Sequence, residues 1–449
     1  MNIRLSALLL MSCLSAALCY AATPADSIAT PKVISLSECL HEGLDNNYSL
    51  RIVKNNELIA YENATRANAG YLPVVNANAG YGGSVQSRAT RERDTHLKSN
   101  EHGVTDHALS ASLNAEWTIF DGFKIQTNYQ RLQELQRQSA TQTRVAIEDY
   151  MAQLVAQYYN FVQQHIRMRN FRYAVSLSRE RLRIVQERYI IGSNSRLDLQ
   201  QAQVDFNADS AQSLKQYELL ATSRIRLNEL MAAKDLNRLL TVRDTAINVD
   251  AALLFDSLWH ATLRDNNELI LADHNKRLAE LDLRSVRSRD YPYVKLNAGY
   301  GYSQNLYGSG VTDRRLTHGT DFGVTVGFKL FDGQRNRERR TARIAIENAE
   351  LARRDIEVSL RADLSDLWQA YRNNLRLLDL ERQNLITAQE NHFIAYERYL
   401  LGDLSGIEMR EAQKSLLDAE ERILVAEYNT KLCEISLLQI SGGILSYLE

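Results

Sequence analysis

Proline is scarce in this chain of 449 residues, which contains only 4. Pro24 and Pro31 lie near the N-terminus, so Pro73 and Pro292 are the only prolines in the rest of the sequence. Because proline interrupts helices and is abundant in linkers and collagen-like repeats, its scarcity argues against those classes and favours long helices. The formal net charge of −2 likewise gives no electrostatic reason to expect a nucleic-acid partner.

Long hydrophobic runs are also missing, apart from one at the N-terminus. Residues 1–21 have the pattern of a secretory signal peptide, because Arg4 precedes an apolar run and small residues precede a cleavage site near Ala21. That run is too short to cross a bilayer, and no later segment approaches about 18 consecutive apolar residues. A lipoprotein signal is the alternative, although the residues before Cys13 and Cys19 fit one poorly.

Cysteine is too scarce to cross-link the fold. After the predicted signal peptide only Cys39 and Cys433 remain, too few for a disulfide framework or a zinc site. We expect two unpaired, buried thiols, and the alternative is a single disulfide between the first and last helices of the mature chain. Three histidines, His96, His102 and His107, share one polar segment, but their spacing matches no metal-ligand motif, so we expect no metal site.

The sequence repeats itself with a period of about 210 to 220 residues, far longer than the units of a solenoid. Five short markers recur in the same order in both copies, which indicates a duplication. They are Asp45–Asn47 with Asp265–Asn267, Pro73 with Pro292, Asn78–Gly82 with Asn297–Gly301, Phe120–Gly122 with Phe331–Gly333, and Arg188–Gly192 with Arg398–Gly402. We therefore predict repeat 1 at residues 22–233 and repeat 2 at residues 256–449, joined by an inter-repeat junction at 234–255.

Glycine is absent from residues 123–191 and absent again from residues 334–401, and both windows also lack proline. Both carry helix formers with apolar residues at helical spacing, so each predicts a helix too long for a compact globule and typical of a coiled coil. A glycine-containing turn ends each window, and a second helix follows at once. The predicted helical hairpins are residues 123–233 in repeat 1 and 334–440 in repeat 2.

Four segments between the helices alternate apolar and polar residues, as strands do. Each is about 9 to 13 residues long, the length of a tilted strand that crosses a bilayer. They lie in two predicted strand hairpins, 71–120 and 291–331, with polar loops at Gln86–Asp106 and Gln304–Gly319. A soluble sheet with one buried face is the alternative, but the flanking helices offer that face no obvious cover.

Four strands cannot close a barrel, because about eight are the practical minimum. Open sheet edges are not tolerated in hydrocarbon, so several chains must share one barrel. A dimer would give eight strands with an interior filled by side chains, whereas a trimer would give twelve strands and room for a pore. The predicted fold class is mainly α with membrane β, built from a duplicated repeat of long coiled-coil hairpins and four strands per chain.

This combination resembles the TolC-like family of outer-membrane efflux and secretion ducts, the outer membrane factors. The resemblance covers essentially the whole mature chain and rests on the doubled Arg-Tyr-x-x-Gly turn, the doubled Phe-Asp-Gly at a strand end, and the proline that opens a strand in each copy. It implies a homotrimer whose twelve-stranded β-barrel lies among the lipids of the outer membrane of a diderm bacterium and continues as a helical tunnel in the periplasm. It also implies a passive channel without a cofactor, which works with a periplasmic adaptor and an inner-membrane pump or secretion ATPase.

The same resemblance assigns roles to two groups of residues. An adaptor would dock at the hairpin tips, which are marked by Gly192, Ser195, Gly402 and Ser405. The periplasmic constriction and its gate would include Glu408, Glu411, Asp198 and Tyr399. Because Glu408 and Glu411 are three residues apart, they share one helix face and would form stacked acidic rings in a trimer, which select cations.

One position departs from the pattern of the family. The basic residue that the family places opposite Asp198 and Tyr399 falls at Leu404 here. A salt-bridged latch would then need Arg196 or Arg410 as a substitute. From the residues alone, two glutamates at helical spacing are usually a solvated helix face, so only the resemblance raises them to a constriction.

No enzyme motif is present, because the sequence has no phosphate-binding loop, no Ser-His-Asp arrangement and no His-Glu-x-x-His. We therefore predict no catalysis. The arginines between Arg335 and Arg343 follow a predicted membrane strand, so lipid headgroup contacts or a solvated helix face explain them better than nucleic acid does. The alternative function is a secreted coiled-coil scaffold or adhesin without a pore. Drug, metal and protein cargo share this architecture, and the sequence does not choose among them.

Overall fold

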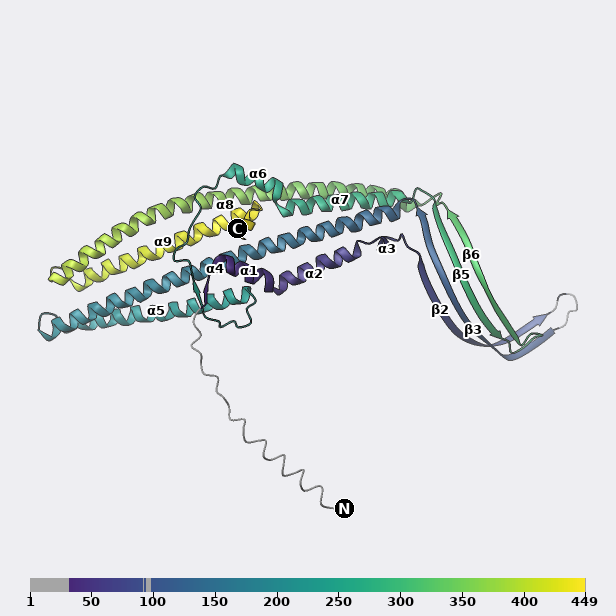
Figure 1. Cartoon of the computed structure of the whole chain (residues 1–449), viewed down its shortest axis with the longest axis horizontal. Coiled ribbons are helices and arrows are strands. Elements are labelled where there is room, and N and C mark those ends of the chain that lie inside the picture. Colours follow the sequence, from purple (N-terminus) through teal and green to yellow (C-terminus); the bar gives the residue numbers. More distant parts are fainter. Residues whose placement is uncertain (1–31, 92, 94–97, 449) are drawn as a thin grey trace, which may run out of the picture. The chain divides into compact units, whose positions relative to one another are not determined.

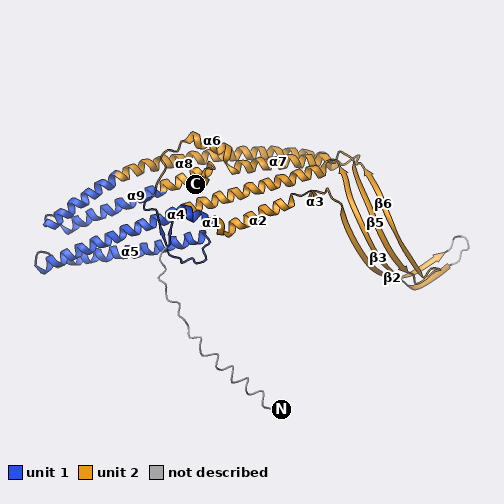
Figure 2. Ribbon diagram, viewed as in Figure 1, with its two compact units in different colours: residues 1–43, 157–247, 383–428 blue, residues 44–156, 248–382, 429–449 orange. Residues whose placement is uncertain are grey.

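The computed structural model describes residues 32–91, 93 and 98–448 (Figure 1). The predicted signal peptide at residues 1–21 and the side chain of His96 lie outside the described residues. The chain divides into two compact units, which Figure 2 draws in two colours. Unit 1 comprises residues 1–43, 157–247 and 383–428, and unit 2 comprises residues 44–156, 248–382 and 429–449. Each unit therefore contains segments of both predicted repeats.

Unit 1 consists of helices and one small sheet. Its strands β1 (Lys32–Ile34) and β4 (Leu240–Val242) pair in parallel. Three-residue strands are too short to show a sequence period, so the inter-repeat junction does not reveal this pairing in advance. The helices of unit 1 are α5 (Arg196–Leu230) and parts of α1 (Leu36–Asn46), α4 (Lys124–Ile190), α8 (Gly333–Leu401) and α9 (Gly406–Ile440).

The long helices pack in unit 1 through side chains at steps of three and four residues, the spacing of a coiled coil. Several of these residues are alanines, whose small side chains let neighbouring helices approach closely. One cluster is formed by Ala388 of α8 with Leu416 and Ala419 of α9. A second, nearer the turns, consists of Val185, Ala202, Ala395, Tyr399, Met409 and Ala412, with Leu404 packed against it.

Unit 2 contains a four-stranded antiparallel sheet in the order β2-β3-β5-β6, seen in Figure 1. The strands are β2 (Val74–Arg91), β3 (Lys98–Asp121), β5 (Tyr293–Leu306) and β6 (Arg314–Gly327). The β3–β5 pair joins segments that are far apart in the chain, with Leu113 opposite Tyr300. The other elements confined to unit 2 are α2 (Tyr48–Asn63), α3 (Arg66–Ala69), α6 (Phe255–Asp265), α7 (Asn267–Ser288) and the 3-10 helix η1 (Ile444–Leu448).

The strands are longer than the alternating segments of the sequence, with 18, 24, 14 and 14 residues in chain order. Most of the segment Gln86–Asp106, which was expected to be a loop, forms strand. The loop expected at Gln304–Gly319 is also shorter than predicted, because β5 and β6 extend into it. Polar residues can extend a ladder wherever both faces of it are exposed, so these extensions show no apolar alternation. At the other end, β6 stops at Gly327, before residue 331, where the predicted strand hairpin ends.

The sheet leaves apolar side chains uncovered within the described chain. Val75, Tyr81, Leu113, Phe322 and Val324 are all more than half exposed, and Phe322 reaches 87%. A continuous apolar sheet surface of this kind normally marks an interface with another protein or with a membrane. The two edge strands, β2 and β6, each pair on one side only in the described chain.

Cys39 and Cys433 are both free thiols in the described chain, so the alternative of a disulfide between them is not realised. Cys39 is fully buried, and burial raises the pKa of its thiol to about 12. Cys433 is only half-buried, which corrects the expectation that both thiols are buried. No helix among the described residues is both long enough and apolar enough to cross a membrane.

Candidate functional site

The Arg-Tyr-x-x-Gly motif ends α4 with a Schellman turn. Gly192 has a φ of +82°, a left-handed conformation that glycine adopts without steric cost. The N–H of Gly192 donates to the carbonyl of Tyr189 at 3.0 Å, and the N–H of Ser193 donates to the carbonyl of Arg188 at 2.8 Å. These two bonds satisfy carbonyl groups that would otherwise lack partners at the helix end.

The second copy of the motif ends α8 in the same way. Gly402 has a φ of +84°, and its N–H donates to the carbonyl of Tyr399 at 3.1 Å. The N–H of Asp403 donates to the carbonyl of Arg398 at 3.0 Å. A Cβ added at either glycine would meet no atom within 4 Å, so backbone conformation alone requires glycine in both turns.

Each turn leads into a helix that begins with a capping box. At the start of α5, Ser195 Oγ accepts from the Asp198 N–H at 3.1 Å, and the Ser195 N–H donates to Asp198 Oδ2 at 3.0 Å. At the start of α9, Ser405 and Glu408 exchange the same pair of bonds, at 3.3 and 3.0 Å. Asp198 and Glu408 therefore occupy equivalent positions, and both help to start a helix.

Glu408 remains ionised at neutral pH in this position. Hydrogen bonds from the hydroxyl and the N–H of Ser405 lower the pKa of its carboxyl group. Glu411 lies about one turn further along α9, and both glutamate side chains are exposed.

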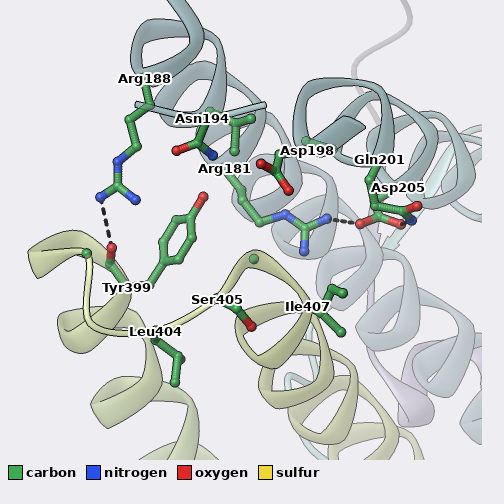
Figure 3. A pocket seen from close by; sticks show the side chains of 14 residues that line it. Arg181, Arg188, Asn194, Asp198, Gln201, Asp205, Tyr399, Leu404, Ser405 and Ile407 are labelled. Atoms are coloured by element: carbon green, nitrogen blue, oxygen red, sulfur yellow. Dashed lines mark hydrogen bonds and ion pairs between the residues drawn. The ribbon is translucent and has the colours of Figure 1, made fainter. Parts of the chain in front are cut away.

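The two turns approach each other in unit 1 and enclose a pocket of about 280 Å³ (Figure 3). Four of the residues proposed from the sequence line it, namely Asp198, Tyr399, Gly402 and Ser405. The other four, Gly192, Ser195, Glu408 and Glu411, are not among its lining residues. The remaining walls include three charged side chains that the sequence did not indicate, Arg181, Arg188 and Asp205.

Arg188 fastens the end of α8 to α4. Its Nη2 donates to the carbonyls of Tyr399 and Leu400, at 2.9 and 3.1 Å, and its guanidinium carbon lies 5.0 Å from the centre of the Tyr399 ring. A positive charge at the C-terminal end of a helix is favourable, because the last carbonyls of the helix carry partial negative charge. The same arginine thus makes both a charge-assisted hydrogen bond and a cation–π contact.

Tyr399 is the most enclosed side chain of the pocket wall. It is 2% exposed, and its hydroxyl has no hydrogen-bond partner in the described chain. Burial raises the pKa of this phenol, although Arg188 and Arg181 oppose the rise. The tyrosine is therefore neutral at physiological pH and presents an unpaired donor inside the pocket.

Two buried ion pairs extend from the pocket along the helices. Arg181 Nη2 of α4 lies 2.5 Å from Asp205 Oδ2 of α5, and these side chains are 5% and 14% exposed. Further along, Arg410 of α9 makes a bidentate pair with Asp209 of α5, at 2.6 and 2.7 Å. Ser178 of α4 donates to Asp209 as well, so one carboxylate joins three helices.

These contacts correct one expectation about the latch. Arg410 does not take the place of the missing basic residue beside Asp198, because it binds Asp209 instead. Leu404, at the position where the family pattern has a basic residue, packs against the apolar cluster of the turns. A signal for the pairs exists in the sequence, since Asp205 and Asp209 are four residues apart and therefore share one face of α5.

Comparison with known proteins assigns most of the chain to one family. A family model described as "Outer membrane efflux protein" matches residues 39–233 and 258–443. Outer membrane protein TolC of Vibrio cholerae serotype O1 is 21% identical over 427 residues, which cover 91% of both chains. A probable outer membrane lipoprotein, SilC of Salmonella typhimurium, is 23% identical over 429 residues and 91% of this chain, with 86% of its own length covered.

Solved structures have the same fold. The outer membrane protein VceC of Vibrio cholerae superimposes with a TM-score of 0.71 over 91% of this chain and 96% of its own, at 15% sequence identity. The Campylobacter jejuni CmeC outer membrane channel gives a TM-score of 0.72 over 91% of this chain and 85% of its own, at 16% identity. At these identities the superpositions speak for the fold alone.

Proposed function

This chain belongs to the outer membrane efflux protein family, and on that basis we propose that three copies of it form a passive channel from the periplasm to the exterior. The family is one of outer-membrane channels, and the chain is an outer-membrane protein. We propose that each protomer contributes four strands to a twelve-stranded barrel and its long helices to a periplasmic tunnel.

The open sheet of unit 2 is the observation that carries this proposal. β2 and β6 have unpaired edges in the described chain, and the apolar side chains of the sheet are exposed. Unpaired backbone groups cost several kcal/mol each in hydrocarbon, so strands in a membrane must close into a barrel. Pairing β6 of one protomer with β2 of the next satisfies both edges, and three protomers exceed the minimum of about eight strands.

The duplication of the chain fits such a tunnel, because each protomer would supply two similar helical hairpins to its wall. We propose that residues 22–233 and 256–449 are the two repeats, and that each supplies a strand hairpin and a helical hairpin. The two segments that match the family model, 39–233 and 258–443, fit this division. The turns at Gly192 and Gly402 have the same conformation, as expected for duplicated hairpins.

We propose that the two turns are the docking tips for a periplasmic adaptor. Exposed apolar side chains surround the turn glycines, with Ile190, Ile191, Leu197, Leu401 and Ile407 between 77% and 84% exposed. Apolar groups at this exposure favour burial against a partner protein. Gly192, Ser195, Gly402 and Ser405 hold these residues in position through the turns and caps. The adaptor would connect the channel to an inner-membrane pump or secretion ATPase, which supplies the energy.

We further propose that Glu408 and Glu411 form the periplasmic constriction in the trimer, and that Asp198 and Tyr399 belong to its gate. Both glutamates are exposed on one face of α9. Threefold repetition would place six carboxylates around the axis, a ring arrangement that favours cations. The Arg188 contact with the Tyr399 carbonyl would keep the tips closed.

Reconstitution tests the channel directly. The full chain, purified in detergent and added to planar bilayers, is expected to give discrete cation-selective conductance steps, and cross-linking should give trimers. Glu408→Gln with Glu411→Gln should lower the cation selectivity. The matched control is Glu390→Gln, which neutralises an exposed acid on α8 instead of α9 and should leave the selectivity unchanged. A protein that stays monodisperse without detergent and gives no conductance would contradict the proposal and favour a scaffold.

A further inference from the structure

The start of α8 carries an unusual concentration of positive charge. Residues 333–343 contain five arginines against one glutamate, a net charge of +4. Counted from the matching glycine of the same Asp-Gly pair, residues 122–132 at the start of α4 have a net charge of only +2. Both segments are helical, so the extra arginines are not needed to form a helix at this point.

Two of the five arginines have structural partners at the end of α7. Arg335 Nη1 lies 2.9 Å from Asp290 Oδ1, and Arg339 pairs with the other oxygen of the same carboxylate. The one acidic residue of the segment, Glu338, is bound by Arg289 at 2.6 Å. These contacts fix the position of α8 and neutralise the two nearby carboxylates, those of Asp290 and Glu338.

The other three, Arg337, Arg340 and Arg343, have no such role. Their side chains are exposed, and their guanidinium groups make no ion pair or hydrogen bond within the described chain. Successive steps of three residues place them on one side of the helix, within an arc of about 120°. The next acidic residue along α8 is Glu347.

Exposed aromatic and apolar side chains lie immediately before these arginines in the chain. Phe328 is 52% exposed, and Leu330 and Phe331 are each 87% exposed. At the same end of the sheet, Phe123 contacts Phe120 and Tyr291 edge to face, with ring centres 5.2 and 5.7 Å apart. Aromatic side chains gather in this way where a membrane protein crosses from hydrocarbon to water.

We propose that Arg337, Arg340 and Arg343 form a binding surface for the phosphate groups of anionic phospholipids in the periplasmic leaflet of the outer membrane. The proposal rests on the proposed function, which places the helical end of the sheet at the membrane surface. At about 1.5 Å per residue, the three arginines lie about 6 to 15 Å along α8 from its first residue. Lipid headgroups extend over a comparable depth, and long arginine side chains can reach back toward them.

The chemistry of the surface fits a phosphodiester. A guanidinium group binds two phosphate oxygens at once, and the exposed Phe331 offers an apolar surface to the acyl chains of the same lipid. A second copy of this chain is a less suitable occupant, because Asp290 and Glu338, the acidic side chains beside these arginines in the described chain, are already paired. A soluble anion would use the guanidinium groups but not the neighbouring apolar side chains.

The experiment measures binding of fluorescent phosphatidylglycerol to the full chain in detergent, with phosphatidylcholine and inorganic phosphate as comparison probes. A single basic residue near an anionic surface accounts for about fivefold in affinity. The triple variant Arg337→Gln, Arg340→Gln, Arg343→Gln should therefore bind phosphatidylglycerol about 100-fold more weakly. The control Arg372→Gln with Arg376→Gln changes exposed arginines further along α8 and should bind like the wild type.

Several results would overturn the lipid surface. The proposal would be refuted if the triple variant bound phosphatidylglycerol with unchanged affinity, or if the wild type bound phosphatidylcholine equally well. It would also be refuted if inorganic phosphate at equal concentration displaced the lipid. Loss of the trimer in the triple variant would assign the arginines to a subunit contact instead. Single-channel recording on the same samples separates the two proposals. Conducting channels with unchanged lipid affinity would refute only the lipid surface, whereas a wild type without channels would refute the proposed function.

Discussion

Replacing Arg410 by methionine tests whether one buried ion pair holds three helices together in unit 1. Arg410 donates two hydrogen bonds to Asp209, which is 11% exposed in its side chain, and Ser178 donates the third. Methionine keeps the apolar length of arginine but removes both donors. Breaking a buried pair costs about 3–5 kcal/mol. We expect the low end, about 3 kcal/mol, because the Ser178 hydroxyl remains and Arg410 is itself 25% exposed.

Hydrogen exchange measures this loss locally, without requiring reversible unfolding of a trimer. A loss of about 3 kcal/mol in local stability corresponds to about 150-fold faster exchange of the amides on α5 around Asp209 and on α9 around Gln413. The matched control is Arg226→Met, which removes an exposed pair with Glu229 at 3.6 Å and should change exchange by less than about fivefold.

A second variant separates the charge from the packing. Asp209→Leu combined with Arg410→Met replaces both charges by apolar side chains and should recover most of the protection, because no unpaired buried charge remains. If the Arg410→Met variant exchanged no faster than the Arg226→Met control, the buried pair would contribute no more than a surface pair, and the reasoning would be refuted.

Three further predictions concern the turns. Gly402→Ala should lower the stability by about 1–2 kcal/mol, because Gly402 has a positive φ, and the loss should appear as a lower thermal midpoint. The control Gly406→Ala lies in ordinary helical backbone and should keep the wild-type midpoint. Equal midpoints for the two variants would contradict the prediction. Arg188→Met removes the bonds to the Tyr399 and Leu400 carbonyls and should increase the open fraction in single-channel recordings; an unchanged fraction would remove Arg188 from the gate. The lowered pKa of Glu408 means that its cap stabilises the fold above the unfolded pKa of 4.5 and is lost as pH falls through the folded pKa. The difference in thermal midpoint between wild type and Glu408→Gln should therefore shrink below pH 4.5, and a constant difference would contradict the assignment.

The two turns show which structural features can be predicted from nearby residues alone. Gly192 and Gly402 are predictable as helix ends, and Ser195 and Ser405 as caps, because each depends on residues within about five positions. The long helices and the strands are predictable for a related reason, since the absence of glycine and the alternation of apolar residues act along a single segment. The extent of β2 and β3 is harder to predict, because polar residues with both faces exposed carry no period.

The proposed site is only partly predictable. Asp198 and Tyr399 line one pocket, and Asp198 caps its own helix just as Glu408 does. The sequence did not indicate that Arg181 and Arg188 complete the wall of that pocket. The pairing of β1 with β4 could not be read from three residues on each side. In both cases the missing information was which distant segment lies alongside.

By itself, the sequence determined the elements of this protein: two long helices in each half, the glycine turns between them, and four strands that no single chain can cover. Only the tertiary structure decided which charges meet, joining Arg181 to Asp205 and Arg410 to Asp209 while leaving Leu404 in an apolar cluster. The physical reason is the range of the interactions. Turns, caps and periodicity depend on neighbours in the chain, whereas an ion pair between helices depends on their relative register, which is set by the packing of many side chains at once.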